Sequence, residues 1–353
     1  MTLHRTPSRS HPRSFARRAV AALAVVGLLG LAACSSDSSA DGDGNGDGKK
    51  IPLTIAYQNI PNGDLVVKNS GWLEKALPGY EIEWKLFDSG GSVNEAFAGG
   101  SIDIGLAGSS PVSRGLSAPI AYKVPWIHDV IGSAEALAVQ DGITSITDLV
   151  GKKVAVPFAS TAHYSLLAAL ETAGVDPTTV DIIDAEPDAI AAAWSQGSID
   201  AAYVWNPVLA QLVSEGATIL TDSADVAASG KTTYDLAVVS TKFATDHPEA
   251  VQEWVAQQSR AVELYRSDPD TWAKAVGAEL SLDPVEVLDQ AAGLIFLTAE
   301  EQAGPEYLGG GLGTNLVATA SFNLEAKSID AVLDKDAYLS AVYPDAVDAV
   351  AKG

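Results

Sequence analysis

The stretch VAVPFASTAHYSLLAALETAG, residues 154–174, decides the fold. Its apolar beginning predicts a buried strand, and its second half has the apolar spacing of an amphipathic helix that ends at Gly174. Ser160 and Thr161 lie between the two, where the first backbone N–H groups of the helix have no acceptor inside the helix. A strand that leads directly into a helix N-terminus is typical of α/β proteins, in which ligands bind beyond the carboxyl ends of the strands.

The same alternation of strand and helix signals extends over most of the chain. Short apolar runs predict nine buried strands, and the segments between them have helical spacing. After Ser240 the pattern predicts helices alone, several of which begin at an acidic residue beside a proline. The sequence therefore predicts an α/β fold in which helices cover mostly parallel sheets. The predicted strands are residues 52–57, 82–87, 103–108, 135–140, 152–157, 180–185, 201–205, 217–221 and 235–240.

Two further strand-to-helix junctions have the same composition as the one at Ser160. FDSGGS contains Ser89 and Ser92 around two glycines, and GLAGSSP contains Ser109 and Ser110. The N–H groups and the positive end of the helix dipole make such a turn an anion receptor that needs no charged side chain. The alternative is that these serines are ordinary N-caps, each worth about 1 kcal/mol to its helix. The recurrence at three junctions favours anion binding.

The first 33 residues have the features of an export signal. A basic head with five arginines precedes an apolar run, residues 19–33, which is shorter than the roughly 20 residues that a spanning helix needs. LAAC, residues 31–34, resembles the lipobox of bacterial lipoproteins, which implies cleavage before Cys34 and acylation of that cysteine. A plain secretory signal is the alternative. Export by the Sec or by the twin-arginine route, which Arg17 and Arg18 suggest, stays open.

Residues 34–50 predict a flexible tether, because they are rich in Ser, Asp and Gly and have almost no apolar residue. Once the signal is removed, 17 basic and 45 acidic residues remain, which is a net charge of −28. Such a charge repels nucleic acid and anionic lipid, so an anionic ligand has to be held by local geometry. Cys34 is the only cysteine of the chain, which excludes an intrachain disulfide and a thiol nucleophile in the core.

Several segments taken together resemble the taurine-binding proteins of bacterial sulfonate ABC importers. The most specific of them are STAHYSLLAAL, residues 160–170, and DAAYVWNP, residues 200–207, whereas DIGLAGSSP is shared with relatives that bind other cargo. The resemblance covers nearly the whole chain after the tether. The other segments that carry it are AYQ (56–58), FDSGGS (87–92), SAEALAV (133–139), TDSADV (221–226) and YDLAVVS (234–240).

The resemblance implies a periplasmic-binding-protein fold of the second type, with a ligand cleft between two lobes. One lobe comprises residues 51–136 and 238–353, and the other is the insert 137–237. Each lobe is a mixed, mostly parallel sheet flanked by helices, and the cargo is captured when the lobes close. The family also implies delivery of the cargo to a membrane permease and its ATPase. The carrier is then a monomer without cofactor, lipid-anchored at the outer face of the cytoplasmic membrane.

Taurine would place a sulfonate at one end of such a cleft. Sulfonate oxygens only accept hydrogen bonds and carry a permanent charge, so neutral donors suffice. The candidate donors are the backbone N–H groups of Ser92, Ser110 and Thr161, the hydroxyls of Ser89, Ser109 and Ser160, the amide of Gln58 and the ring of His163, for which a structural hydrogen bond is the alternative. Apart from Arg114, beyond the first turn of its helix, the three turns contain no arginine or lysine, which disfavours a dianionic phosphate.

The ammonium of taurine needs acceptors that carry charge and preferably an aromatic face. Asp235 and Glu135 lie where the chain is expected to cross between the lobes, and Trp205 ends a strand of the second lobe. Tyr164 is a candidate lid. Asp129 lies in VPWIHDVIG (124–132), which departs from the taurine-binding pattern, and adds a third carboxylate if it faces the cleft. Which of the three acids meets the amine stays open, and core packing is the alternative role of both aromatic residues.

Two other interpretations stay open. The same binding role is compatible with another cargo, namely an aliphatic sulfonate, nitrate or a pyrimidine precursor. An enzyme is the other class, because relatives of thiamine-pyrimidine synthases share the lobe pattern. However, the chain has no G-x-S-x-G elbow, its histidines are not spaced as metal ligands, and the synthase reaction requires a cysteine-rich segment. The sequence therefore favours a binding protein over an enzyme and predicts no metal site.

Overall fold

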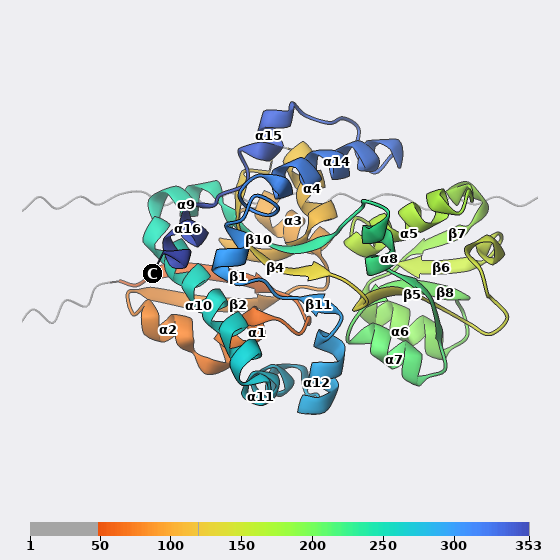
Figure 1. Cartoon of the computed structure of the whole chain (residues 1–353), viewed down its shortest axis with the longest axis horizontal. Coiled ribbons are helices and arrows are strands. Elements are labelled where there is room, and N and C mark those ends of the chain that lie inside the picture. Colours follow the sequence, from red (N-terminus) through yellow and green to blue (C-terminus); the bar gives the residue numbers. More distant parts are fainter. Residues whose placement is uncertain (1–48, 119, 353) are drawn as a thin grey trace, which may run out of the picture. The chain divides into compact units, whose positions relative to one another are not determined.

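The computed structural model describes residues 49–118 and 120–352, and two separate sheets organise them (Figure 1). The first sheet has six strands, in the order β11 (Leu294–Ile295), β4 (Tyr122–Ile131), β10 (Tyr234–Ser240), β3 (Ile104–Gly108), β1 (Ile51–Tyr57) and β2 (Tyr80–Leu86). β1, β2, β3 and β4 run in one direction, and β10 and β11 run in the other. β10 therefore separates β3 from β4, although these two strands are consecutive in the sequence.

The second sheet has five strands, in the order β7 (Asp181–Asp184), β6 (Lys153–Val156), β8 (Ala201–Trp205), β5 (Glu135–Val139) and β9 (Thr218–Asp222). β5 opposes the direction that the other four share. Both sheets are thus mixed but mostly parallel, and helices flank them, as predicted. All nine predicted strands are present.

The helices connect the strands and fill the chain after β10. Those between the strands are α1 (Gly63–Ser70), α2 (Trp72–Ala76), α3 (Gly90–Ala98), α4 (Ser109–Ser117), α5 (Thr161–Thr172), α6 (Pro187–Ser195), α7 (Val208–Ser214) and α8 (Ser223–Ala228). Those after β10 are α9 (Thr241–Asp246), α10 (Pro248–Ser267), α11 (Pro269–Leu280), α12 (Pro284–Ala291), α13 (Ala299–Gln302), α14 (Gly311–Glu325), α15 (Lys335–Leu339) and α16 (Asp345–Ala351). Two short 3-10 segments are Ile146–Leu149 and Pro177–Thr179. The acid-proline pattern marks helix starts correctly at α11 and α12, where Asp268 and Asp283 cap the first turn.

The central strands are apolar because both faces of each sheet are covered. β5 sends Leu137 into one buried cluster and Ala138 into another, since successive side chains point to opposite faces. In the first sheet a continuous buried cluster contains the large side chains of Trp254 and Trp272. This two-sided burial explains why the strands read as unbroken apolar runs in the sequence.

The sequence prediction misses β4 and β11. β4 contains Pro125, His128 and Asp129, which break the apolar run by which a buried strand is recognised, and β11 has two residues. β4 is nevertheless firmly held. Gln302 donates to Ile127 O (2.9 Å) and accepts from Ile127 N (2.8 Å).

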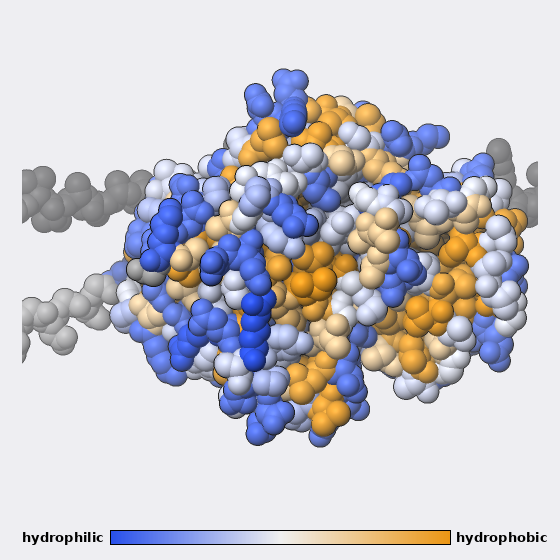
Figure 2. Space-filling model, viewed as in Figure 1, coloured by the Kyte–Doolittle hydropathy of each residue, from blue (hydrophilic) through white to orange (hydrophobic). Residues whose placement is uncertain are grey.

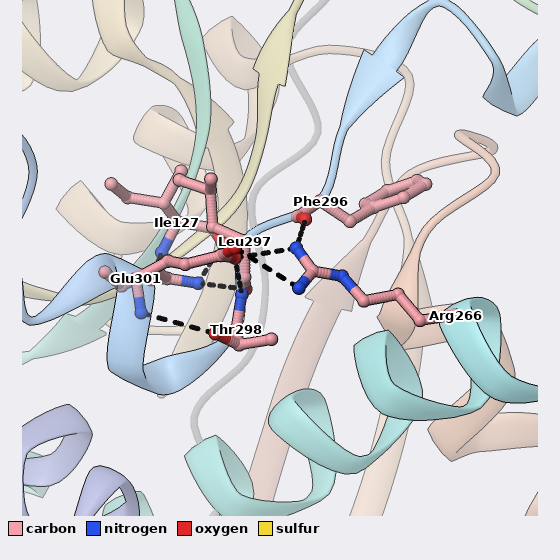
Figure 3. Close-up of polar contacts among 7 residues, drawn as sticks. Ile127, Arg266, Phe296, Leu297, Thr298 and Glu301 are labelled. Carbon is pink, nitrogen blue, oxygen red and sulfur yellow. Dashed lines mark hydrogen bonds and ion pairs between the residues drawn. The ribbon is translucent and has the colours of Figure 1, made fainter.

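The segment that follows β11 is fixed to the long helix α10 (Figure 3). Arg266 on α10 donates to Phe296 O (2.9 Å) and pairs with Glu301 (2.6 Å). Gln302 also donates to Leu297 O (3.0 Å). β4 and the segment after β11 are therefore positioned by the same short stretch of chain.

The chain passes from one sheet to the other twice, between β4 and β5 and between α8 and β10. At the first crossing Gly132 N donates to Gly293 O (3.0 Å), and a Cβ on Gly293 would lie 2.3 Å from Ala134 N. Only glycine permits this approach of two backbones. The lobe boundaries at residues 136/137 and 237/238 stay a prediction, and the strands place Glu135 in the second sheet and Tyr234 in the first.

The predicted signal, Cys34 and most of the predicted tether lie outside the described residues. Lys49 and Lys50, the last two residues of the tether, are exposed. In the described ranges, no helix combines the length and the apolar character needed to cross a membrane. On the face shown in Figure 2, hydrophilic residues cover α10 and α11, and hydrophobic residues gather over α6 and α7.

Candidate functional site

A cavity with about 440 Å³ of space not filled by protein atoms, open solvent at its mouth included, lies among residues contributed by elements of both sheets. Six of the predicted site residues line it, and each lies at or next to the end of a strand or the start of a helix. They are Gln58, Glu135, Ser160, Thr161, Trp205 and Asp235. These six residues are up to 177 positions apart in the sequence, from 58 to 235.

The three predicted anion-binding turns meet at this cavity. Gly90 of α3, Gly108 before α4 and Thr161 of α5 all line it. A Cβ on Gly108 would lie 2.5 Å from Thr161 Cγ2, and a Cβ on Gly90 would lie 2.7 Å from Pro111 Cγ. Because glycine has no Cβ, the N-termini of α3, α4 and α5 approach one another closely enough to address one small ligand.

The serine hydroxyls at these turns already have structural partners. Ser89 Oγ accepts from Ser92 N (3.5 Å) and donates to Glu186 (3.1 Å), and Ser160 Oγ accepts from His163 N (3.1 Å) and donates to Pro157 O (2.6 Å). Both hydroxyls therefore act as N-caps of their helices, as the alternative interpretation of these serines holds. In α5 the N–H groups of Thr161 and the next residue have no acceptor within the helix, so they are the donors that remain for an anion.

The two serines of α4 also bond elsewhere. Ser109 Oγ accepts from Tyr234 N (3.2 Å), and Ser110 Oγ donates to Asn323 (3.4 Å). Neither residue lines the cavity, but α4 has a glycine N-cap without a side-chain cap. The first N–H groups of α4 are thus not occupied by a capping side chain, in contrast to α3 and α5.

Gln58 lines the cavity directly after β1. Its Nε2 donates to Leu106 O at 3.0 Å, and the side chain is 4% exposed. The amide nitrogen that was predicted to donate to an anion is therefore bonded to the backbone of β3.

Three buried carboxyl groups lie together beside the cavity. Asp129 is 0%, Glu135 1% and Asp235 6% exposed, and the last two line the cavity. Asp235 is directly opposite Asp129 in the pairing of β10 with β4. In the described ranges, none of the nine ion pairs includes any of the three acids. A cluster of this kind favours a cation, because buried acids without a basic partner gain most from one.

Hydrogen bonds distinguish the three acids. Glu135 accepts from Thr161 Oγ1 (2.5 Å), Ser223 Oγ (2.7 Å) and Ser165 Oγ (3.5 Å). Neither carboxylate oxygen of Asp129 has a partner among the described residues. The environment of Glu135 is therefore polar, whereas that of Asp129 offers no donor.

The same environments raise the pKa of each acid. Burial raises the pKa of Asp235 to about 8, and nearby Glu135 adds to the rise. Burial raises the pKa of Glu135 to about 7, although its three hydroxyl donors lower it. Burial, with Asp235 and Glu135, raises the pKa of Asp129 well above its ordinary value. Acids with raised pKa values in a cavity are typical of functional sites.

Seven of the predicted residues do not line this cavity, namely Ser89, Ser109 and Ser110, described above, and Ser92, Asp129, His163 and Tyr164. The ring of His163 stacks on Phe158 at 4.5 Å, and burial, together with the nearby Arg114 charge, lowers its pKa to about 4. Tyr164 packs edge-on against Phe322 at 4.6 Å. Ser92 lines a second cavity. Asp129 is the cross-strand partner of Asp235 but does not line the cavity. The seven residues stay predictions as direct ligands.

The second cavity is larger and lies along α3 and beside the C-terminal end of α4, with about 1500 Å³ of space that includes open solvent. Arg114 lines it, and burial lowers the pKa of that guanidinium. The acids Glu95, Asp184, Glu186 and Asp330 line the same cavity. Arg114 therefore does not belong to the first cavity, whose lining contains no arginine or lysine.

The apolar lining of the first cavity and one amide side chain in it were not predicted from the sequence. Asn206 follows Trp205 inside the recognised stretch DAAYVWNP, and its Nδ2 donates to Gln290 O (3.2 Å). Its position within that stretch is the signal that could have identified it. Ile60, Ile131, Ala134 and Leu294 have no such signal, because they lie in a loop, at a crossing or in the unpredicted strands β4 and β11.

Comparison with known proteins assigns the chain to a group of related sequences. A family model described as NMT1/THI5 like matches residues 63–272. The taurine-binding periplasmic protein of Escherichia coli (strain K12) is 37% identical over 288 residues, which are 80% of this chain and 89% of that protein.

Solved structures show the same fold at lower identity. The alkanesulfonate-binding protein from Xanthomonas axonopodis pv. citri, bound to MOPS, aligns with a TM-score of 0.70 and 23% identity, over 84% of this chain and 99% of that one. The desulfurization enzyme DszB aligns with a TM-score of 0.60 and 18% identity, over 86% of this chain and 99% of that one. At these identities the likeness shows the fold alone, which binding proteins and an enzyme share.

Proposed function

The chain belongs to the NMT1/THI5-like family, and on that premise we propose that it is the extracytoplasmic substrate-binding lipoprotein of an ABC importer, with taurine as its cargo. The E. coli relative, named as a taurine-binding periplasmic protein, supports the cargo. The observation that carries the proposal is the cavity itself. It joins the N-termini of three helices to a cluster of buried acids, and no arginine or lysine lines it.

The two ends of taurine match the two halves of this cavity. The sulfonate lies against the first N–H groups of α4 and α5, whose dipoles favour an anion without a titratable partner. The ammonium lies against Asp235 and Glu135, with the face of Trp205 nearby, which adds about 0.5–2 kcal/mol. A sulfonate without an amine leaves the buried acids without a cation, which is costly.

The proposal extends to how the protein works in the cell. Residues 51–136 with 238–353 and residues 137–237 act as two lobes that close on the cargo, and the closed form delivers it to a permease and its ATPase. The signal is removed before Cys34, and acylation of Cys34 holds the monomer at the outer face of the cytoplasmic membrane. No bond of the cargo is broken, which agrees with the name of the E. coli relative as a binding protein.

Calorimetry with the full chain in detergent tests the cargo. Taurine is expected to bind with a Kd at least about 30-fold lower than that of ethanesulfonate, which keeps the anion and lacks the amine. If ethanesulfonate binds as tightly as taurine, the cargo is an aliphatic sulfonate instead. Deletion of the gene is expected to abolish uptake of labelled taurine, and unchanged uptake would reject the transport role.

A further inference from the structure

Asp129 is a buried carboxyl group that the proposed cargo contacts leave without a role. It is fully buried, and neither of its oxygens has a hydrogen-bond partner among the described residues. It lies directly opposite Asp235 in the antiparallel pair of β4 and β10. Residues in this position point to the same face, with Cβ atoms about 4.5–5.5 Å apart. The carboxyl groups of Asp129 and Asp235 are therefore neighbours.

The elements of the site present no positive charge to this pair. β5 supplies Glu135, and β3 and β11 contain no charged residue. β8 supplies Tyr203, whose hydroxyl bonds Ser223. Arg114 on α4 lines the second cavity, and His163 on α5 stacks on Phe158.

The basic groups of the other packed elements have partners elsewhere. On α9, Lys242 pairs with Asp246. On α10, Arg260 lies over the ring of Trp72 and Arg266 pairs with Glu301. On β4, Lys123 donates to Ser340 O and His128 lies 3.6 Å from Asp64. The charged neighbours that act on Asp129 are thus the acids Asp235 and Glu135.

Two buried carboxylates without a counter-ion do not both ionise. When Asp129 is protonated, its O–H is a donor for the carboxylate of Asp235, so the neutral form gains the hydrogen bond that the charged form lacks. The raised pKa values of Asp129 and of Asp235 agree with this arrangement.

We propose that Asp129 and Asp235 share one proton in the cargo-free protein, and that the ammonium of the cargo displaces this proton, which leaves to solvent. The inference rests on the proposed function. One positive charge enters the cluster as another leaves it, so the net charge of the buried groups does not change. Asp129 then determines specificity without contacting the cargo, because an anion without an amine has nothing to exchange for the proton.

The exchange makes capture dependent on pH. When one proton leaves for each cargo bound, the apparent affinity rises about tenfold for each pH unit as long as the pair is protonated. Above the pH at which the pair loses its shared proton, the affinity becomes constant. The affinity therefore falls as the surroundings become acidic.

Calorimetry of taurine binding at pH 7, in two buffers with different ionisation enthalpies, counts the protons released. The full chain is expected to release about one proton per taurine. Asp129→Asn keeps the shape and places an amide donor beside Asp235, so Asp235 is ionised beforehand and the count falls towards zero. Glu95→Gln changes an exposed acid of the second cavity and is expected to keep the count of the unchanged protein.

The outcomes separate the two proposals. Taurine binding with no proton release, and with constant affinity from pH 6 to pH 8, overturns the exchange and leaves the proposed function intact. Equal release by the unchanged protein and Asp129→Asn overturns the role of Asp129. Absence of taurine binding by the unchanged protein at any pH rejects the proposed function itself. Should Asp129→Asn not fold, the count in the unchanged protein decides.

Discussion

Asp235 connects the fold of the chain to the chemistry of its cargo at the scale of a single residue. It belongs to β10, the strand that completes the first sheet, and it lines the cavity at the second crossing between the sheets. Its register places it opposite both Gly108 on β3 and Asp129 on β4. Asp235 is thus paired with the glycine turn that is proposed to bind the anion and with an acid of the cluster that is proposed to bind the cation.

Asp235→Asn is expected to raise the Kd for taurine about 100-fold, because a buried charge-assisted pair with the ammonium is lost. The Kd for ethanesulfonate is expected to change less than about threefold, since this ligand has no ammonium to lose. Calorimetry at pH 8 measures both, and Glu95→Gln serves as the control acid. An equal rise in the Kd of both ligands would show that Asp235 does not contact the ammonium group.

The close contact of α4 with α5 belongs to the scale of elements. Gly108 precedes α4, and any Cβ there would press on the side chain of Thr161 at the start of α5. The two helix N-termini can therefore share one anion only while residue 108 is glycine. This requirement concerns the distance between elements and not the conformation of the turn, because the φ of Gly108 is −63°.

Gly108→Ala is accordingly expected to raise the Kd for taurine at least about tenfold, because the added Cβ forces the N-termini of α4 and α5 apart. The melting temperature of the cargo-free protein is expected to stay within about 3 °C of the original. Gly79→Ala is the matched control, because a Cβ on Gly79 meets nothing within 4 Å. Unchanged affinity in Gly108→Ala would show that the anion does not lie between α4 and α5.

The strands and helices also show which parts of the fold could be predicted from the sequence. The nine apolar runs and the acid-proline helix starts were recognisable because they depend on local pattern. Thr161 was singled out by its helix start, and Glu135 and Asp235 by the resemblance, and all three line the cavity. β4 was not recognisable, because His128 and Asp129 interrupt its run. The use of the serine hydroxyls was not recognisable either, since Ser89 bonds Glu186 from a distant part of the chain.

At the scale of the whole molecule, buried titratable groups make folding dependent on pH. Burial raises the pKa of Asp64 and of Glu135 to about 7 and that of Asp235 to about 8, whereas it lowers the pKa of His128 to about 3 and that of His163 to about 4. Below about pH 6.5 the histidines of the unfolded chain take up protons, and their effect on the free energy of unfolding partly offsets that of the acids. Above that pH only the acids make the free energy of unfolding depend on pH.

Between pH 6.5 and pH 8 the unfolded chain has already released the protons that the folded acids retain. The free energy of unfolding of the cargo-free protein is therefore expected to fall over this window by about 1–3 kcal/mol, and Asp129, whose pKa is also raised, extends the fall to higher pH. Urea titrations at half-unit pH steps measure the curve. Saturating taurine is expected to raise stability more at pH 8 than at pH 6.5, and a curve that rises with pH would contradict the raised pKa values.

The strand order of the first sheet has a consequence for how the polypeptide assembles. β3 and β4 are made one after the other, but they are held apart by β10, which arrives more than a hundred residues later. The insert that forms the second sheet is continuous, so it can pair its own strands first. In a chain that is exported from its N-terminus, β10 therefore joins the first sheet after β3 and β4. The cavity is complete only once β10 lies between these two strands.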